Sequence, residues 1–500
     1  MAYISQLGSY SFSLPSEVWP VVNYRIICGN LLYLCKTLLP CNIIISLTIL
    51  LSNIIIFGME LPNIPITARV NGAIILESLK NPFISAILGP RRVGKSTFIA
   101  WYMESYSKHL WVSLNMDILS QRKIIESEQL QSEIERQALQ KIGAAKKIWV
   151  AIDEAQKCPE LFEQIKVIYD LFKDKNSIKF ILTGSASLDL HNLAAESLAG
   201  RIDLLDLREF TIRETAQFNN SINISGNSLL DQLAEDHTKI KQIITAAMPY
   251  QSILHESLQL QLVYGGLPEV MALQSARERF RYLDQYIQSY LEKDVRKITE
   301  ITNLDLYQKL LAVLAEYTGS LRDDSRLLES LGCARNTLKK YRGYLIATKV
   351  FQEVFPVMQD SLKRIIKSPK GYIQNNGILS VLTGLDNLNI LKKSGKIGYR
   401  LENWFLKELQ VWLDRSFKRQ HIYFWRTTRD REVDFIVEQK PNLIPFEVTY
   451  STIIDSRKIN NLVAFMQQNK NCACGVLIYN GTYLYKPDLK IHCIPAWTIC

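Results

Sequence analysis

The sequence contains few residues that bind metals or form disulfides, and their spacing gives no metal-ligand motif. Nine cysteines and six histidines are spread over 500 residues. The closest cysteines, Cys472 and Cys474, form only a C-x-C, and Cys158 stands alone. This pattern excludes a disulfide-dense extracellular module. It favours reduced thiols, as in a cytoplasmic protein, over disulfides or a zinc site.

Acidic residues are also in deficit. The chain has 49 Asp and Glu against 59 Lys and Arg, a formal net charge of +10. Such an excess favours an anionic partner without identifying it. Hydrophobic residues make up 47% and charged residues 22%, which is typical of a globular protein, and the length predicts two to four domains.

One short motif is found in residues 88–97, which read LGPRRVGKST. It matches the pattern G-x-x-x-x-G-K-[ST], whose backbone N–H groups form a concave anion site. The run Pro82–Leu88 predicts a strand and the following residues predict a helix, which is the context that the motif requires. We therefore expect the loop to bind ATP through Gly89, Pro90, Arg91, Arg92, Val93, Gly94, Lys95, Ser96 and Thr97.

Acidic groups that suit nucleotide chemistry follow a later strand. Residues 148–152 are apolar and run directly into Asp153 and Glu154. This order is expected for a Mg²⁺ ligand followed by a residue that activates water. Lys95 would contact the β- and γ-phosphates, while Ser96 and Asp153 would hold Mg²⁺. ATP and Mg²⁺ are therefore the expected cofactors.

Two further polar residues complete the predicted site. A strand at 178–182 leads into Thr183, whose hydroxyl would sense the γ-phosphate or its attacking water. Arg201, in a Gly-Arg pair, would sense the γ-phosphate or act as a finger toward a neighbouring subunit of a homo-oligomer. The alternation of strands and helices predicts a nucleotide-binding α/β domain over residues 59–215.

The N-terminal region contains an uncharged stretch, residues 37–59, that is long enough to span a bilayer. Arg25 and Lys36 precede it, so the positive-inside tendency would place the ATP site outside, where there is no ATP. This conflict favours Met59 as the true start, with residues 1–58 being translated upstream sequence. A membrane anchor at 37–59 is the alternative.

Residues 216–355 are predicted to be mainly helical. Within them, residues 325–354 resemble a helix-turn-helix followed by a wing. Arg335, Lys339 and Arg342 recur at i, i+4 and i+7 and share one helix face. A basic face on the second helix suits contact with DNA phosphates, and docking of a protein is the equally supported alternative.

Residues 356–500 predict a second α/β domain. A hairpin around residues 432–450 places Asp434 on one strand and Glu447 on the next, and Glu402 belongs to a preceding helix. The two strand carboxylates are candidate ligands for a second Mg²⁺ site.

Taken in order, the motifs over residues 60–455 resemble those of a known family. The chain resembles a family of prokaryotic AAA-type ATPases with a restriction-endonuclease-like C-terminal domain. This implies an ATP-binding first domain, a winged-helix-like middle and a nuclease-type fold at the end. The matching stretches are GPRRVGKST, IDEAQKCPELFEQIK, ILTGSAS, ESLAGRIDLLDL, YGGLPEV, YLEKDV, SPKGYIQNNG, RLENWFLKEL and FWRTTRDREVDFIVE with LIPFEVTYS.

The C-terminal site departs from the family pattern. Restriction-endonuclease-like sites resemble D…E-x-K, in which two carboxylates hold Mg²⁺ and the lysine polarises the attacking water. Asp434 and Glu447 fit, but Thr449 stands where the lysine is expected. Lys458 and Arg426 are the nearby replacements.

A second departure is Asn375, where family members tend to carry an acidic residue. We therefore expect a C-terminal domain that binds DNA or a protein without cutting DNA. The leading interpretation is an ATPase whose nucleotide state controls this DNA- or protein-binding half. The alternatives are an ATP-gated, Mg²⁺-dependent DNA nuclease and a slow nucleotide-dependent signalling switch that docks proteins.

Overall fold

The chain divides into two compact units, Met1–Asn63 and Ile64–Cys500, and all residues described by this computed structural model belong to the second. The interpretations of residues 1–58 and 37–59 therefore lie outside the described residues. None of the described helices is long and apolar enough to cross a membrane. The described residues are 69–70, 72–107, 109–139, 147–173, 177–185, 196–224, 228–293, 295, 301–357, 368–415, 420–427, 431–439 and 441–499.

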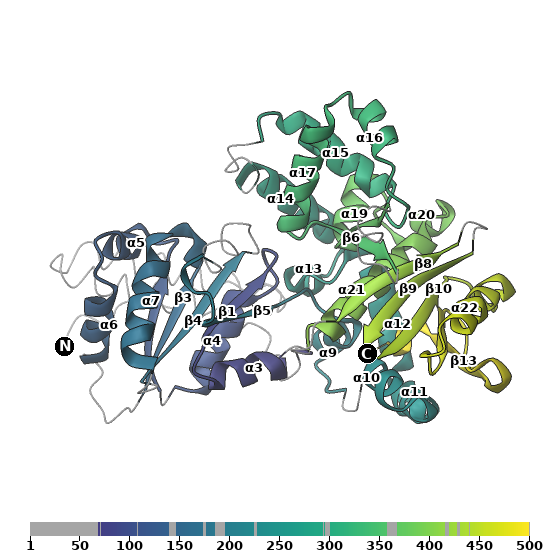
Figure 1. Cartoon of the computed structure of the whole chain (residues 1–500), viewed down its shortest axis with the longest axis horizontal. Coiled ribbons are helices and arrows are strands. Elements are labelled where there is room, and N and C mark those ends of the chain that lie inside the picture. Colours follow the sequence, from purple (N-terminus) through teal and green to yellow (C-terminus); the bar gives the residue numbers. More distant parts are fainter. Residues whose placement is uncertain are drawn as a thin grey trace, which may run out of the picture. The chain divides into compact units, whose positions relative to one another are not determined.

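The first described domain is built on a sheet with the strand order β2-β3-β4-β1-β5 (Figure 1). All neighbouring strands run parallel, so their carboxyl ends meet at one edge, where open α/β sheets bind ligands. The strands are β1 (Ile84–Gly89), β2 (Leu110–Asn115), β3 (Ile148–Asp153), β4 (Ile178–Ser185) and β5 (Ile202–Asp206). The helices are α3 (Gly72–Lys80), α4 (Lys95–Ser105), α5 (Leu119–Glu126), α6 (Leu130–Leu139) and α7 (Glu160–Phe172), with the 3-10 turn η2 (Ala155–Lys157).

Alternating side chains of these strands enter two different cores. Ala86 and Leu88 of β1 join the core that contains α5, α6 and α7, whereas Ile87 joins the core that contains α3 and α4. Val150 and Trp149 of β3 divide in the same way. Burial on both faces explains why the strands read as continuous apolar runs. The structure confirms the predicted α/β class for this domain.

A helical segment follows the first sheet. Two of its helices have side-chain caps at their first turn. Asn303 accepts a backbone N–H bond at the start of α15, and Asp323 does so at the start of α16. The elements are α9 (Ile212–Asn220), α10 (Leu229–Glu235), η4 (His237–Lys239), α11 (Ile240–Ala247), η5 (Met248–Tyr250), α12 (Gln251–Tyr264), α13 (Pro268–Ala272), α14 (Ala276–Lys293), α15 (Leu304–Glu316), α16 (Asp324–Leu331) and α17 (Arg335–Ala347).

Helices α16 and α17 correspond to the two helices of the predicted helix-turn-helix, but the predicted basic face is wrong in one residue. Arg335 and Lys339 are exposed, whereas Arg342 is buried. The Arg342 guanidinium donates to Asp324 over 2.8 Å and lies 3.1 Å from Glu353. Helical spacing alone puts the three cations on one face, but two acids from neighbouring elements bind Arg342 inside the fold.

The C-terminal part contains an eight-stranded mixed sheet among the described residues, in the order β12-β13-β11-β10-β9-β8-β6-β7 (Figure 1). The predicted hairpin is present, because β9 pairs antiparallel with β10. The strands are β6 (Phe351–Pro356), β7 (Lys370–Ile373), β8 (His421–Arg426), β9 (Glu432–Gln439), β10 (Asn442–Val448), β11 (Gly475–Tyr479), β12 (Leu484–Lys486) and β13 (Ile491–Pro495). The helices are α19 (Asn376–Thr383), α20 (Leu388–Lys393), α21 (Ile397–Leu413) and α22 (Ser456–Gln468), with the 3-10 turns η7 (Pro487–Leu489) and η8 (Ala496–Thr498).

One face of this sheet shares a hydrophobic core with helices from far earlier in the chain. Leu229 of α10 and Leu258 of α12 belong to the same buried cluster as Trp404 of α21, Phe446 of β10 and Trp497 near the C-terminus. Two segments separated by the helix-turn-helix region therefore fold around one core.

Candidate functional site

The phosphate loop lies between the end of β1 and the start of α4, at the carboxyl edge of the first sheet. The backbone of the loop shows why both of its glycines are required. Gly94 has φ 94°, a conformation that residues with side chains rarely adopt. A side chain at Gly89 would collide with the carbonyl oxygen of Leu207. The loop therefore needs both glycines for its shape, and Val93 anchors it by packing into the core.

Lys95 is buried inside the curve of this loop. Its Nζ donates to the carbonyl oxygens of Gly89 over 3.0 Å and Pro90 over 2.8 Å. Burial lowers the pKa of Lys95 to about 8, although the carboxylates of Glu154 and Asp153 oppose the shift. An anion at the loop would favour the charged ammonium again.

Three predicted residues from three separate elements meet beside the loop. The Ser96 hydroxyl donates to Asp153 Oδ2 over 2.9 Å, and the buried Thr183 hydroxyl donates to Asp153 Oδ1. Glu154 follows in a left-handed conformation with φ 54°, and its carboxylate accepts from Gln156 over 2.9 Å. These neighbouring hydroxyl and carboxylate oxygens are the kind of ligands that Mg²⁺ prefers.

The structure does not bring Arg201 to this group. Its guanidinium donates to both carboxylate oxygens of Asp170 on α7, over 3.0 and 2.9 Å. Its carbonyl oxygen accepts from Ile84 N over 2.8 Å, at the amino end of β1. The length of a six-residue strand, about 20 Å, therefore separates Arg201 from the loop. Its role as a finger toward a neighbouring subunit stays a prediction.

Arg92, at the tip of the loop, makes contacts that the sequence did not indicate. It has φ 62°, and its guanidinium lies 3.6 Å from Glu269 of α13. The same group lies over the ring of Tyr282 of α14, 4.8 Å from its centre. The Tyr282 hydroxyl in turn donates to Glu269. The phosphate loop thus contacts the helical segment directly.

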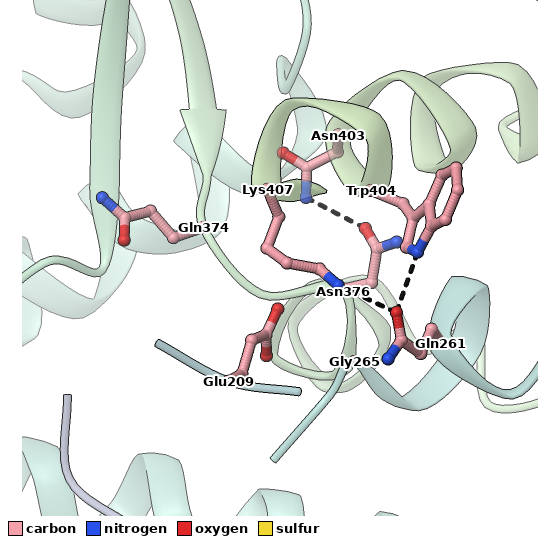
Figure 2. Close-up of a pocket in the computed structure, with 8 residues that line it drawn as sticks. All are labelled: Glu209, Gln261, Gly265, Gln374, Asn376, Asn403, Trp404 and Lys407. Carbon is pink, nitrogen blue, oxygen red and sulfur yellow. Dashed lines mark hydrogen bonds between the residues drawn. The ribbon is translucent and has the colours of Figure 1, made fainter. Parts of the chain in front are cut away.

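A buried polar cluster joins the end of the first domain to the helices α12, α19 and α21 (Figure 2). Lys407 Nζ donates to Phe210 O and to Gln261 Oε1, both over 2.9 Å. Asn375 caps α19 and donates its side-chain amide to Glu209. The space between the lining residues is too small for a water molecule. We therefore read the cluster as a structural junction and not as a ligand site.

A second group of charged residues surrounds the hairpin of the C-terminal sheet. Asp434 of β9 and Glu447 of β10 lie on neighbouring strands, as predicted, and both are buried. Lys458, from α22, lies between them, with Nζ 2.9 Å from Asp434 Oδ2 and 2.7 Å from Glu447 Oε2. Asn461, one helical turn further, donates to Glu447 Oε1 over 3.0 Å. Lys458 therefore brings an ammonium group to both carboxylates from a different element than the one that carries Thr449.

Strand β7 brings a second lysine to this group. The Nζ of Lys370 lies 3.3 Å from Glu402 and 3.7 Å from Asp434, and it also contacts Glu432. The Tyr372 hydroxyl donates to Glu402 over 2.7 Å. Lys370 and Tyr372 belong to the matching stretch SPKGYIQNNG, but nothing in its spacing places them beside a hairpin that begins about 60 positions later.

The charges of this cluster are interdependent. Burial raises the pKa of Asp434, but Lys458 and Lys370 outweigh burial, so the pKa falls below its ordinary value. Burial and the neighbouring Asp434 raise the pKa of Glu447 well above its ordinary value. Burial also raises the pKa of Glu402, against the effect of Lys370. The arrangement therefore favours one charged and one protonated carboxyl on the two hairpin strands.

Three other residues considered for this site have different surroundings. Thr449 follows β10 and donates its backbone N–H to Ile478. Arg426 lies 3.6 Å from Glu432, at the rim of the cluster. Asn375 belongs to the junction with Glu209, so the expectation that it is an altered nuclease-site residue is wrong.

Three family models match parts of the chain. An AAA domain matches residues 81–216, and two domains of unknown function, DUF8612 and DUF4143, match residues 255–389 and 398–499. The first match confirms the predicted AAA-type P-loop ATPase domain. The winged helix and the restriction-endonuclease-like fold stay predictions.

The chain is similar to two relatives and to solved structures. Uncharacterized proteins of Mycobacterium bovis and Mycobacterium tuberculosis are each 28% identical over 348 residues, covering 69% of this chain and 68% of the relative. A structure of Drosophila ORC bound to DNA covers 64% of this chain and 95% of its own, at 14% identity and a TM-score of 0.24. The Aeropyrum pernix ORC1 protein in complex with DNA covers 65% and 95%, at 12% identity and a TM-score of 0.25. TM-scores this low do not establish a shared fold.

Proposed function

We propose that this chain, whose residues 81–216 form an AAA-type ATPase domain, hydrolyses ATP and uses its nucleotide state to control its C-terminal half. The observation that supports hydrolysis is the meeting of Ser96, Asp153 and Thr183 beside Lys95 of the loop. The carboxylate of Asp153 lets this site hold Mg²⁺ beside the phosphates, and hydrolysis needs that ion.

Each residue then has a distinct role. Lys95 binds the phosphates, and Ser96 and Asp153 hold Mg²⁺. The oxygen atoms of these two side chains, 2.9 Å apart, fit that ion. Bound Mg²⁺ supplies positive charge that stabilises the transferring phosphoryl group. Glu154 orients the attacking water, and Thr183 fixes the carboxylate of Asp153.

The contact of Arg92 with Glu269 and Tyr282 supports control of the C-terminal half. Nucleotide binding changes the charge at the loop, and Arg92 is both part of the loop and bound to α13 and α14. A nucleotide that attracts Arg92 weakens its hold on these helices. The nucleotide and the helices α13 and α14 would thus compete for Arg92. The coupling is the resulting difference in the strength of the Arg92 contact between the two nucleotide states.

The exposed side of α17 supports DNA as the partner of that half. A shallow groove of about 380 Å³ is lined by Lys339, Lys340 and Tyr344, together with Asn336 and Gly343. Ammonium groups neutralise phosphates, and an aromatic ring offers a surface for a base. Arg335, exposed on the first turn of the same helix, adds a third cation.

Two substitutions and one control test the ATPase assignment. Lys95→Ala should abolish ATP binding. Glu154→Gln should bind ATP but lower the turnover by about 100-fold or more, as expected when a residue that positions water is lost. Glu160→Gln removes an exposed carboxylate at the start of α7 and should leave both properties unchanged. Wild-type turnover by Glu154→Gln would contradict the role of Glu154.

Arg92→Ala tests the coupling separately. This variant should still bind ATP, since Lys95 and the loop backbone are intact, but its DNA affinity should no longer differ between ATP and ADP. A nucleotide-dependent DNA affinity equal to that of the wild type would remove Arg92 from the proposal and leave hydrolysis untouched.

A second candidate function, a Mg²⁺-dependent DNA nuclease, is favoured by the position of Lys458. The absent lysine at position 449 was one of two reasons to expect no cleavage, and Lys458 reaches the same two carboxylates from α22. A divalent cation bound here would favour the charged forms of Glu447 and Glu402, whose pKa values are raised without it. Its carboxyl ligands are Asp434, Glu447, Glu402 and Glu432.

Nicking of supercoiled plasmid with Mg²⁺ or Mn²⁺ tests this candidate. Nicking by the wild type should disappear in Glu447→Gln and in Lys458→Met, because each removes a group that the chemistry needs. The control Glu438→Gln changes a partly exposed acid on the same strand as Asp434. Absence of nicking by the wild type, or equal nicking by Glu447→Gln, would exclude the nuclease.

A further inference from the structure

A third group of chemically reactive side chains lies beside the strands β11 and β13 of the C-terminal sheet. It consists of His237, which begins η4, Cys474, which directly precedes β11, and His492 of β13. Cys474 and His492 are buried, at 1% and 2% exposure, and His237 is partly buried. Neither the AAA chemistry nor the carboxylate cluster uses any of the three.

The distances among these residues suit a single metal ion. One ligand atom of each residue lies within 4.8 Å of the others. The His492 Nε2 and His237 Nδ1 atoms are 3.3 Å apart. Two nitrogens that each lie about 2.0–2.1 Å from a tetrahedral zinc ion are separated by about 3.3–3.4 Å. The two imidazoles therefore already have the separation of zinc ligands.

The surroundings of His492 orient its ring for this task. The Tyr483 hydroxyl lies 3.1 Å from His492 Nδ1, which leaves Nε2 for the ion. Tyr485, opposite His492 in the β12–β13 pair, stacks on the ring at 4.3 Å. Metal-binding histidines commonly have such a partner on the second nitrogen, because it fixes the tautomer and the orientation.

We propose that His237, Cys474 and His492 form a zinc site, with water as the fourth ligand. On binding, the Sγ–H bond of Cys474 breaks, the proton leaves to solvent and a sulfur–zinc bond forms. Two imidazoles and one thiolate suit zinc, and a blue-copper site would add a weak axial ligand. This proposal does not depend on ATP hydrolysis or on nuclease activity.

The site would fasten the early helices to the last strands of the chain. His237 lies between α10 and α11. Cys474 directly precedes β11, and His492 belongs to β13. The hydrophobic core already joins these segments, and zinc would add a direct link between them. Bound zinc should therefore slow hydrogen exchange in η4 and in β13.

Metal titration of the purified full-length chain tests the proposal. The wild type should bind one Zn²⁺, and Co²⁺ in its place should give a thiolate charge-transfer band. Cys474→Ser should abolish that band, and His492→Gln and His237→Asn should weaken Zn²⁺ binding by at least about 100-fold. The matched control is Cys472→Ser, two positions away and outside the group, which should bind Zn²⁺ like the wild type.

The variants need a check on folding, because two of the three residues are buried. Far-ultraviolet circular dichroism and an unchanged Kd for ATP would show that a variant is folded. His237 is only partly buried, so His237→Asn is the variant least expected to disturb folding. Equal Zn²⁺ binding by wild type and His237→Asn, or no Zn²⁺ binding by the wild type, would each overturn the proposal.

Discussion

Replacement of Lys458 by methionine tests whether its ammonium stabilises the C-terminal sheet. Asp434 and Glu447 are 5% and 1% exposed, and Lys458 contacts both within 3 Å. Removal of one partner of a buried ion pair costs about 3–5 kcal/mol. Lys370, 3.7 Å from Asp434, keeps part of the ion pairing, so we expect a loss at the lower end of that range. Methionine keeps the length of the side chain, so the loss measures mainly the charge.

The backbone N–H of Val448 reports this loss locally. It donates to Asp434 Oδ2 over 2.8 Å, so its hydrogen exchange follows the opening of the hairpin. A loss of about 3 kcal/mol corresponds to exchange roughly 150-fold faster, at about 1.4 kcal/mol for each factor of ten. The matched control is Arg457→Met, because Arg457 is exposed and directly precedes Lys458.

The pH dependence gives this prediction a second readout. In the wild type the lowered pKa of Asp434 contributes stability above its unfolded value of about 3.9, and this is lost only as pH falls through the lower folded value. Without Lys458, burial favours the neutral carboxyl, so the deficit of the variant should shrink as pH falls from 7 toward 4. Exchange within threefold of the wild type, or a deficit independent of pH, would refute the reasoning.

Three further predictions concern other parts of the molecule. Ser96→Ala removes the hydroxyl bound to Asp153, so ATP affinity should lose its dependence on Mg²⁺, and an unchanged dependence in a nucleotide titration would count against that ligand. Joint replacement of Arg335, Lys339 and Lys340 by alanine should lower the salt slope of DNA binding by up to about three, and an unchanged slope would favour protein docking. Burial raises the pKa of Glu408 to about 7 against the effect of Lys407, so folding stability should fall as pH rises from about 4.3 toward 7. Glu408→Gln should flatten that decline in thermal unfolding curves, and an equally steep decline would show that another group causes it.

The nucleotide site was largely predictable because its parts are local in sequence. The runs before Gly89 and Asp153 fold as the strands β1 and β3, and the loop shape follows from two glycines and a lysine. Thr183 could be placed at the same edge because parallel strands end together. Arg201 could not be placed in this way, since it lies before its strand and so at the opposite edge.

The C-terminal site was only half predictable. Asp434 and Glu447 follow from a hairpin, in which neighbouring strands place their side chains together. Lys458 belongs to the helix α22 and Lys370 to the edge strand β7, so no sequence spacing predicts either contact. The same limit applied to Arg342, whose helical position was right but whose acidic partners lie on other elements.

The shared core of α9–α12 and the C-terminal sheet has a consequence for synthesis on the ribosome. Leu258 of α12 is made long before Trp497, which belongs to the same buried cluster. At about 5–20 residues per second, the interval of about 240 residues lasts roughly 10–50 s. During that time the sheet that covers the apolar sides of these helices is incomplete. The nascent chain should therefore be a client of chaperones that bind hydrophobic surface until its last strand emerges.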